Sequence, residues 1–237
     1  MVVEEKSRVE AMEGNQQRME VNILLMGAHN VGKTALTVRF LTRRFIGEYG
    51  DMGESLVCRP HMESISGPQM FEWVSVFAES VYSRMERIHG QEICINIWDS
   101  QVGEKSCWVS EKQLQWADGM ILVYDICDRG SFDAVRQQLQ LVRRSRKPAS
   151  CPVVIVANKR DLQHHRSVSG EEGRLLALTQ GCCFFEVSAA ETYHSVLLVF
   201  HRLVDLVRET RALRKSSAGV RGIVRSMSAV FGKKRAE

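Results

Sequence analysis

The chain has 237 residues, of which 44% are hydrophobic and 25% are charged, and its formal net charge is +4. These values are typical of a globular protein, so disordered, collagen-like and coiled-coil classes are disfavoured. The length allows one large domain or two small ones, because compact domains usually span about 100 to 200 residues. The seven cysteines show no paired, metal-type spacing, and their odd number predicts reduced thiols rather than a disulfide scaffold or a zinc module.

The location of the protein is indicated by two features. No apolar run approaches the roughly 20 residues of a membrane-spanning helix, and the charged residues 1–20 lack the apolar stretch of a signal peptide. We therefore expect a cytoplasmic protein, either free or peripheral at the inner membrane surface. Residues 208–237 carry nine Lys or Arg against two Glu, a net charge of +7. Such a tail predicts contact with an anionic membrane or nucleic acid, or else a solvated end.

The first half of the chain predicts a strand, a helix and a hairpin. Residues 21–26 form an apolar run typical of a buried strand, and residues 33–44 follow with a helical pattern. Residues 81–88 and 92–98 are separated by His89-Gly90, and alternate residues of the second run are isoleucines. This pattern predicts two antiparallel strands joined by a short turn.

The second half predicts alternating strands and helices. Residues 120–124 and 153–157 are short apolar runs, and the helical patterns behind them open at the candidate N-caps Ser131 and Ser169. Residues 182–187 are the last predicted strand, and residues 193–213 form a long amphipathic helix. The sequence thus predicts an α/β fold: a six-stranded, mostly parallel sheet with one antiparallel edge hairpin and helices on both faces.

A phosphate-binding motif lies between the first strand and the first helix. Gly27, Gly32, Lys33 and Thr34 match G-x-x-x-x-G-K-[ST], and the candidate nucleotide-binding set also includes Asn30, Val31 and Ala35. Glycines let backbone N–H groups curl around a β-phosphate, the lysine reaches the β- and γ-phosphates, and the threonine hydroxyl can ligate Mg²⁺. A glycine-rich turn without a ligand is the alternative.

A second motif, Asn-Lys-x-Asp, follows the strand at residues 153–157. Its aspartate, Asp161, can accept hydrogen bonds from the N1 and N2 donors of guanine, a pair that adenine lacks. Ligands bind at the carboxyl ends of strands in open α/β sheets, where Asn158 and Asp161 fall. Asn-Lys-x-Asp is a weak signal alone, and it becomes specific for guanine when it follows the phosphate-binding loop (P-loop) at residues 27–34.

With these two motifs, residues 19–213 resemble the Ras-like small GTPases. Residues 124–132 and 184–189 are similar to the subgroup of the Ras-related oestrogen-regulated growth inhibitor and its Ras-like relatives. The resemblance implies a P-loop NTPase G domain that acts as a signalling regulator and uses GTP or GDP and Mg²⁺.

The resemblance also assigns residues to the site. Asn158 and Asp161 would bind guanine, and Lys159 and Phe45 would pack on the base. The last base-contacting loop would be Ser188, Ala189 and the following alanine, where the family usually has Ser-Ala-Lys. Thr34 and Asp99 would serve Mg²⁺.

The sequence departs from the family where the γ-phosphate is sensed and cleaved. The family has D-x-x-G-Q, whereas this chain reads Asp-Ser-Gln-Val-Gly-Glu from Asp99 to Glu104, so the glycine comes one residue late and no glutamine follows it. In the family that glutamine orients the attacking water. Gln101 could substitute only if the loop is rebuilt. We expect slow hydrolysis of GTP to GDP and phosphate, and the alternative is a pseudo-GTPase that acts as an interaction scaffold.

An insertion is predicted inside the first switch region. Glu79 to Tyr82 resembles the end of the family's effector loop, which family spacing would place soon after Tyr49. Residues 52–78 would then be inserted, whereas a competing alignment takes Glu54-Ser55 as the effector loop. An alternatively spliced or mis-predicted exon is the other explanation. The expected organisation is a tail at 1–19, a G domain at 20–213 and a basic tail at 214–237.

The C-terminal tail has apolar residues at helical spacing with arginines between them. The apolar positions are Val220, Ile223, Val224, Met227, Val230 and Phe231. This pattern predicts weak, reversible contact with a membrane surface through a basic amphipathic helix, and a disordered tail or a helix packed on the core is the alternative. The chain ends without a C-a-a-X box, so we expect no prenylation. Nucleic acid is unlikely as a partner, because no recognisable reading motif accompanies the charge.

Overall fold

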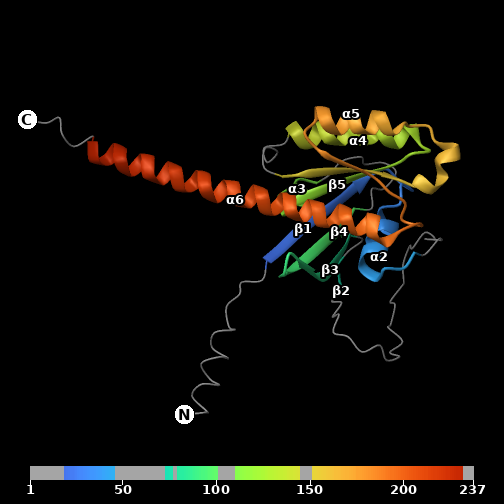
Figure 1. The fold of residues 1–237 in the computed structure, drawn as a ribbon, viewed down its shortest axis with the longest axis horizontal. Coiled ribbons are helices and arrows are strands. Elements are labelled where there is room, and N and C mark those ends of the chain that lie inside the picture. Colours follow the sequence, from blue (N-terminus) through green and yellow to red (C-terminus); the bar gives the residue numbers. More distant parts are fainter. Residues whose placement is uncertain (1–18, 46–72, 77–78, 101–109, 145–150, 232–237) are drawn as a thin grey trace, which may run out of the picture.

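The structure is a computed structural model, and it describes residues 19–45, 73–76, 79–100, 110–144 and 151–231 (Figure 1). Among them, no helix combines the length and the apolar character needed to cross a membrane.

The predicted α/β fold is confirmed, and its centre is one twisted sheet with the strand order β2-β3-β4-β1-β5-β6-β7. The parallel part consists of β4 (Gln91–Asp99), β1 (Met19–Gly27), β5 (Gly119–Asp125), β6 (Val153–Asn158) and β7 (Cys183–Glu186). The expected hairpin pairs β3 (Glu79–Ile88) with β4 in antiparallel register across the two-residue turn. The six predicted strands are therefore all present.

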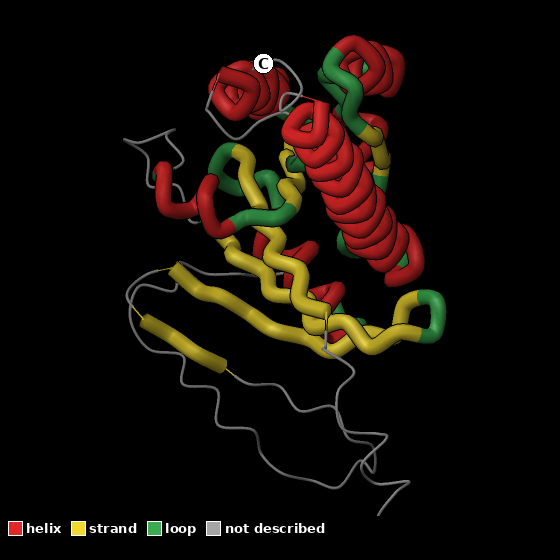
Figure 2. The backbone as a smooth tube through the Cα atoms, turned by 90° about the vertical axis from the view of Figure 1, so that its left-hand side faces the viewer, coloured by secondary structure: helices red, strands yellow, loops and turns green. Residues whose placement is uncertain are grey.

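One further strand extends the sheet beyond the hairpin. The strand β2 (Trp73–Val76) pairs antiparallel with β3, with Trp73 opposite Tyr82 and Val76 opposite Glu79. Figure 2 shows β2 and β3 as neighbouring strands at one edge of the sheet. The sequence did not predict β2, which falls inside the range expected to be an insertion. The rest of that range lies outside the described residues.

Helices cover both faces of the sheet, and the alternation along β1 divides the core between them. Val21, Ile23 and Leu25 pack with α2 (Lys33–Thr42) and α6 (Tyr193–Phe231). Leu24 and Met26 face α4 (Arg129–Arg144) and α5 (Gly170–Thr179). Figure 1 shows these two helix pairs on opposite sides of the sheet. The short helices α3 (Glu111–Trp116) and η2 (Arg160–His165) complete the described elements.

The two predicted N-caps have different outcomes. Ser169 caps α5, because its hydroxyl accepts from the backbone N–H of Glu172, whose side chain accepts in return from the N–H of Ser169. The prediction for Ser131 is wrong, because α4 already begins at Arg129. The side chain of Asp128 accepts from Gly130 at 2.8 Å and takes the capping position, while Ser131 lies inside the first turn.

The last helix is longer than predicted. The expected helix at residues 193–213 continues without interruption to residue 231, so α6 includes the apolar positions of the basic tail. In Figure 1 the distal part of α6 projects well past the sheet. The alternative of a disordered tail is thus contradicted for residues 214–231.

Candidate nucleotide site

Two glycines allow the loop between β1 and α2 to lie close to its neighbours. Gly27 has φ +147°, and a Cβ at this residue would lie 2.2 Å from the carbonyl oxygen of Val123 in β5. Gly32 has φ +91°, and a Cβ there would lie 2.3 Å from Nδ2 of Asn158. Both backbone conformations and both close approaches require glycine. The loop is therefore held against β5 and against the end of β6.

Lys33 is the buried cation of this loop. Its side chain is 8% exposed, and its ammonium donates to the carbonyl oxygens of Gly27, at 3.0 Å, and Ala28, at 2.7 Å. Burial lowers the pKa of Lys33, and the negative charge of Asp99 partly opposes that shift. A cation held at the start of a helix, where backbone N–H groups are unpaired, is suited to bind phosphate.

Thr34 and Asp99 meet beside the lysine. The Thr34 hydroxyl donates to Oδ2 of Asp99 at 2.7 Å, and the Asp99 side chain at the end of β4 is only 3% exposed. Its second oxygen, Oδ1, is buried and has no hydrogen-bond partner among the described residues. Burial raises the pKa of Asp99, although Thr34 and Lys33 both act to lower it. A cation beside Oδ1 would relieve this cost.

The donor set fits Mg²⁺ better than a metal held entirely by protein. No group of three or more His, Cys, Asp or Glu side chains in the described part of the chain is placed to hold a metal ion. Mg²⁺ in phosphate sites is usually bound by one or two protein oxygens together with phosphate oxygens and waters. Thr34 and Asp99 supply such a pair.

Asn158 joins the phosphate loop to the last loop of the site. Its side chain is 2% exposed; Nδ2 donates to the Val31 carbonyl at 2.8 Å, and Oδ1 accepts from the Ala189 N–H at 3.2 Å. One amide thus connects three segments that are far apart in the sequence. Ser188 shapes the same loop, because its hydroxyl accepts from the backbone N–H groups two and three residues further on.

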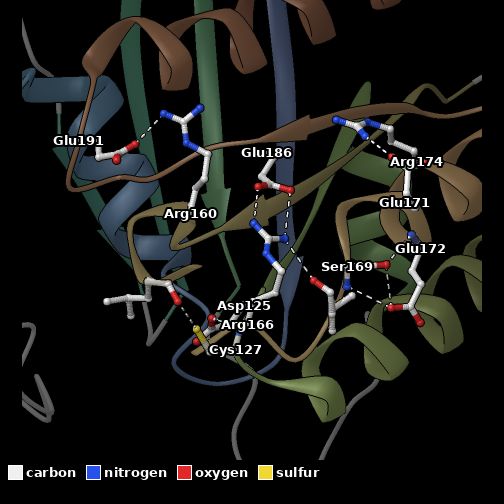
Figure 3. Close-up of polar contacts among 12 residues, drawn as sticks. Asp125, Cys127, Arg160, Arg166, Ser169, Glu171, Glu172, Arg174, Glu186 and Glu191 are labelled. Atoms are coloured by element: carbon white, nitrogen blue, oxygen red, sulfur yellow. Dashed lines mark hydrogen bonds and ion pairs between the residues drawn. The ribbon is translucent and has the colours of Figure 1, made fainter. Parts of the chain in front are cut away.

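The remaining residues of the Asn-Lys-x-Asp motif face outward. Lys159 has a left-handed backbone, and its ammonium pairs with Asp125 at 2.7 Å. Asp161 in η2 is exposed, and no hydrogen bond or ion pair between described residues involves its carboxylate. Arg160, between them, pairs with Glu191 at 2.7 Å (Figure 3). Ion pairs of the two middle residues therefore hold the motif in place, and the carboxylate of Asp161 stays accessible.

The other candidate residues lie as follows. Val31 and Ala35 are buried in the core, whereas Asn30 is exposed with φ +59°. Phe45 follows the end of α2, and its side chain is 41% exposed, so its contact with a base stays a prediction. Gln101 lies outside the described residues.

Sequence reasoning missed the two acidic residues that hold the base motif, Asp125 and Glu191. Asp125 could have been identified as a polar residue at the carboxyl end of a buried strand, next to the end of β6. Nothing in the local sequence marks Glu191, because its partner, Arg160, lies on a different loop.

Comparison with known proteins identifies the family. The Ras family model matches residues 71–209, which is more than half of the chain. Ras-like protein family member 11B of Danio rerio is 38% identical over 195 residues, covering 79% of this chain and 70% of the relative. The Ras-related and estrogen-regulated growth inhibitor-like protein of Bos taurus is 33% identical over 224 residues, covering 91% and 98%. The human Ras-related and estrogen-regulated growth inhibitor is 34% identical over 195 residues, covering 82% and 85%.

The chain therefore belongs to the Ras family of small GTPases, and the predicted resemblance is confirmed. Members of this family are in general GTPases that bind guanine nucleotides, typically with Mg²⁺, and act in signalling.

Proposed function

We propose that this chain binds GDP and GTP together with Mg²⁺ and hydrolyses GTP slowly. The observation that carries the binding part is the cluster of Lys33, Thr34 and Asp99 beside the P-loop. There a buried ammonium and a buried carboxylate with an unpaired oxygen adjoin a helix N-terminus. Anionic phosphate and a divalent cation would together satisfy both groups.

The phosphate side of the proposal assigns roles to these three residues. Lys33 would turn from the loop carbonyls to the β- and γ-phosphates, and Thr34 and Asp99 would hold the metal side. When bound, Mg²⁺ supplies charge neutralisation on the phosphate oxygens. The protein's own contribution is to fix the loop, which the close approaches at Gly27 and Gly32 support.

The guanine side of the proposal rests on Asp161. Its exposed carboxylate follows the left-handed residue Lys159 and has no described partner, so it is available to accept from a guanine base. Asn158 would act indirectly by holding the loops around the base, because both ends of its amide are engaged within the protein.

The slow rate is inferred from the sequence that follows Asp99. Without a glutamine to orient water, the barrier would rise by about 1 to 3 kcal/mol, which is roughly ten- to hundredfold in rate. We also infer an insertion before β3. This is supported by the family match, which begins at residue 71, well after the P-loop, and by the additional strand β2.

Single-turnover hydrolysis on GTP-loaded protein tests the proposal, with GDP and ADP affinities measured in parallel. We expect GDP to bind far more tightly than ADP, and hydrolysis to be slower than in a family member with the Gly-Gln pair. Val102→Gly/Gly103→Gln restores the family spacing after Asp99 and should accelerate hydrolysis. Guanine binding without any turnover in either protein would favour the scaffold alternative, and equal GDP and ADP affinity would refute nucleotide selectivity.

A further inference from the structure

The helix α6 carries two apolar stripes on different sides. The first is buried on the domain and consists of Val196, Val199, Phe200, Leu203, Val204 and Val207, each at most 2% exposed. The second comprises positions 213, 220, 223, 224, 227, 230 and 231. Because an α-helix turns about 100° per residue, the centre of the second stripe is about 140° away from the first.

The second stripe begins on the exposed side of α6. Leu213, the member of this stripe that lies next to the domain, is 70% exposed. Since α6 is one continuous helix to residue 231 and projects past the sheet (Figure 1), helix geometry places the later positions on the same face of the helix as Leu213. A tail helix that folds against its own core would need a break in α6, and the structure has none. The continuous helix therefore leaves contact with this face to an external partner.

The charge of the same segment indicates which partner. No Asp or Glu occurs between residues 210 and 236, whereas this stretch contains eight Lys or Arg. The two arginines nearest the domain form ion pairs within the protein, Arg208 with Asp205 and Arg211 with Asp118. Further along, the sequence adds Arg221 and Arg225 on α6 and a run of three basic residues after it.

We propose that residues 213–231 of α6 form a docking surface for an anionic lipid membrane. The apolar stripe would enter the boundary between headgroups and acyl chains, and the arginines at 221 and 225, on the other side of the helix, would remain at the level of the headgroups. A second copy of the chain is a poorer occupant, because two such segments would bring together cationic helices without any acidic residue to pair them. The proposal is independent of nucleotide binding.

Vesicle cosedimentation of the full chain tests this proposal. The probes are vesicles of phosphatidylcholine alone and of phosphatidylcholine with phosphatidylserine. We expect binding to the anionic vesicles only, with loss of most of it between 0.1 M and 1 M salt, as the Debye length falls from about 10 Å to about 3 Å. Arg221→Gln/Arg225→Gln should lower the partition coefficient about 30-fold, at about 1 kcal/mol per basic residue. Met227→Gln/Phe231→Gln should lower it at least tenfold.

A matched control removes the same charge from the domain. Arg136→Gln/Arg174→Gln changes two exposed arginines on α4 and α5 and should leave vesicle binding unchanged. Binding by the Arg221/Arg225 variant equal to that of the unmodified chain, or equal binding to both vesicle types, would overturn the proposal. So would a preference for a short DNA duplex over vesicles, or a dimer in solution that the Met227/Phe231 variant dissociates.

Discussion

Replacement of Asn158 by alanine should destabilise the protein even before nucleotide is added. The side chain is buried and makes two hydrogen bonds, one to the Val31 carbonyl and one from the Ala189 N–H. Alanine leaves both backbone groups without a partner, and each such buried group costs about 1 to 3 kcal/mol. We expect Asn158→Ala to lower the free energy of unfolding by about 2 to 4 kcal/mol, a large part of a typical 5 to 15 kcal/mol.

Asp161 in the same motif is the matched control. Its exposed carboxylate has no described partner, so Asp161→Ala should change the free energy of unfolding by no more than about 0.5 kcal/mol. Both variants should bind GDP at least tenfold more weakly, for different reasons. Asp161→Ala removes a proposed contact with the base, whereas Asn158→Ala loosens the loops that surround it.

Urea unfolding of nucleotide-free protein, together with GDP titration, separates these effects. If Asn158→Ala weakens GDP binding while the unfolding midpoint and slope stay unchanged, the bridging role of the amide is refuted. A double-mutant cycle with Gly32→Ala gives a second check, since a Cβ at Gly32 would lie 2.3 Å from the Asn158 amide. The two substitutions should therefore cost less together than the sum of their separate effects.

Three further substitutions test other parts of the structure by urea unfolding of nucleotide-free protein without Mg²⁺. Burial raises the pKa of Asp99, so the folded state binds the proton of this carboxyl group more tightly than the unfolded state does. The free energy of unfolding should therefore rise as pH falls through the folded-state pKa. Asp99→Asn should remove this dependence and stabilise the protein at pH 7, and a loss of stability at pH 7 would contradict the argument. Gly27→Ala should cost at least about 2 kcal/mol, because its Cβ would meet the Val123 carbonyl at 2.2 Å and the backbone is left-handed; an unchanged midpoint would show that the loop can shift. Ser169→Ala should cost about 1 kcal/mol through loss of the α5 cap, and a change below about 0.3 kcal/mol would mean that another group caps the helix.

The fold could be predicted from the sequence where one periodicity holds over a whole element. The isoleucines at 93, 95 and 97 alternate because one face of β4 is buried, and all three are inaccessible to solvent. The start of α4 was predicted wrongly, because Ser131 is a good cap by residue type and only the path of the chain after β5 gives the capping position to Asp128. The strand β2 could not be predicted, since its pairing with β3 depends on register rather than on local composition.

The candidate site was predictable to the extent that it is a local motif. The P-loop residues are adjacent in sequence, and their spacing specifies their chemistry. The pairs Lys159–Asp125 and Arg160–Glu191 were not predictable, because each joins residues separated by about 30 positions that only the parallel sheet brings together. The angle between the two apolar stripes of α6 was not predictable either, because it depends on the helix being continuous past residue 213.

Burial of opposite charges at the site links the stability of the protein to its ligands. Desolvation is the largest influence on the pKa of both Lys33 and Asp99, and it shifts each toward its neutral form, so their burial opposes folding. Any ligand that binds only the folded state adds about 2.7 kcal/mol of stability at one hundred times its dissociation constant. Phosphate beside the ammonium and Mg²⁺ beside Oδ1 of Asp99 would each offset part of the desolvation cost, and the Asn158 amide would transmit the gain to the loop at Ala189. We therefore expect phosphate and metal to stabilise the domain together more than either does alone.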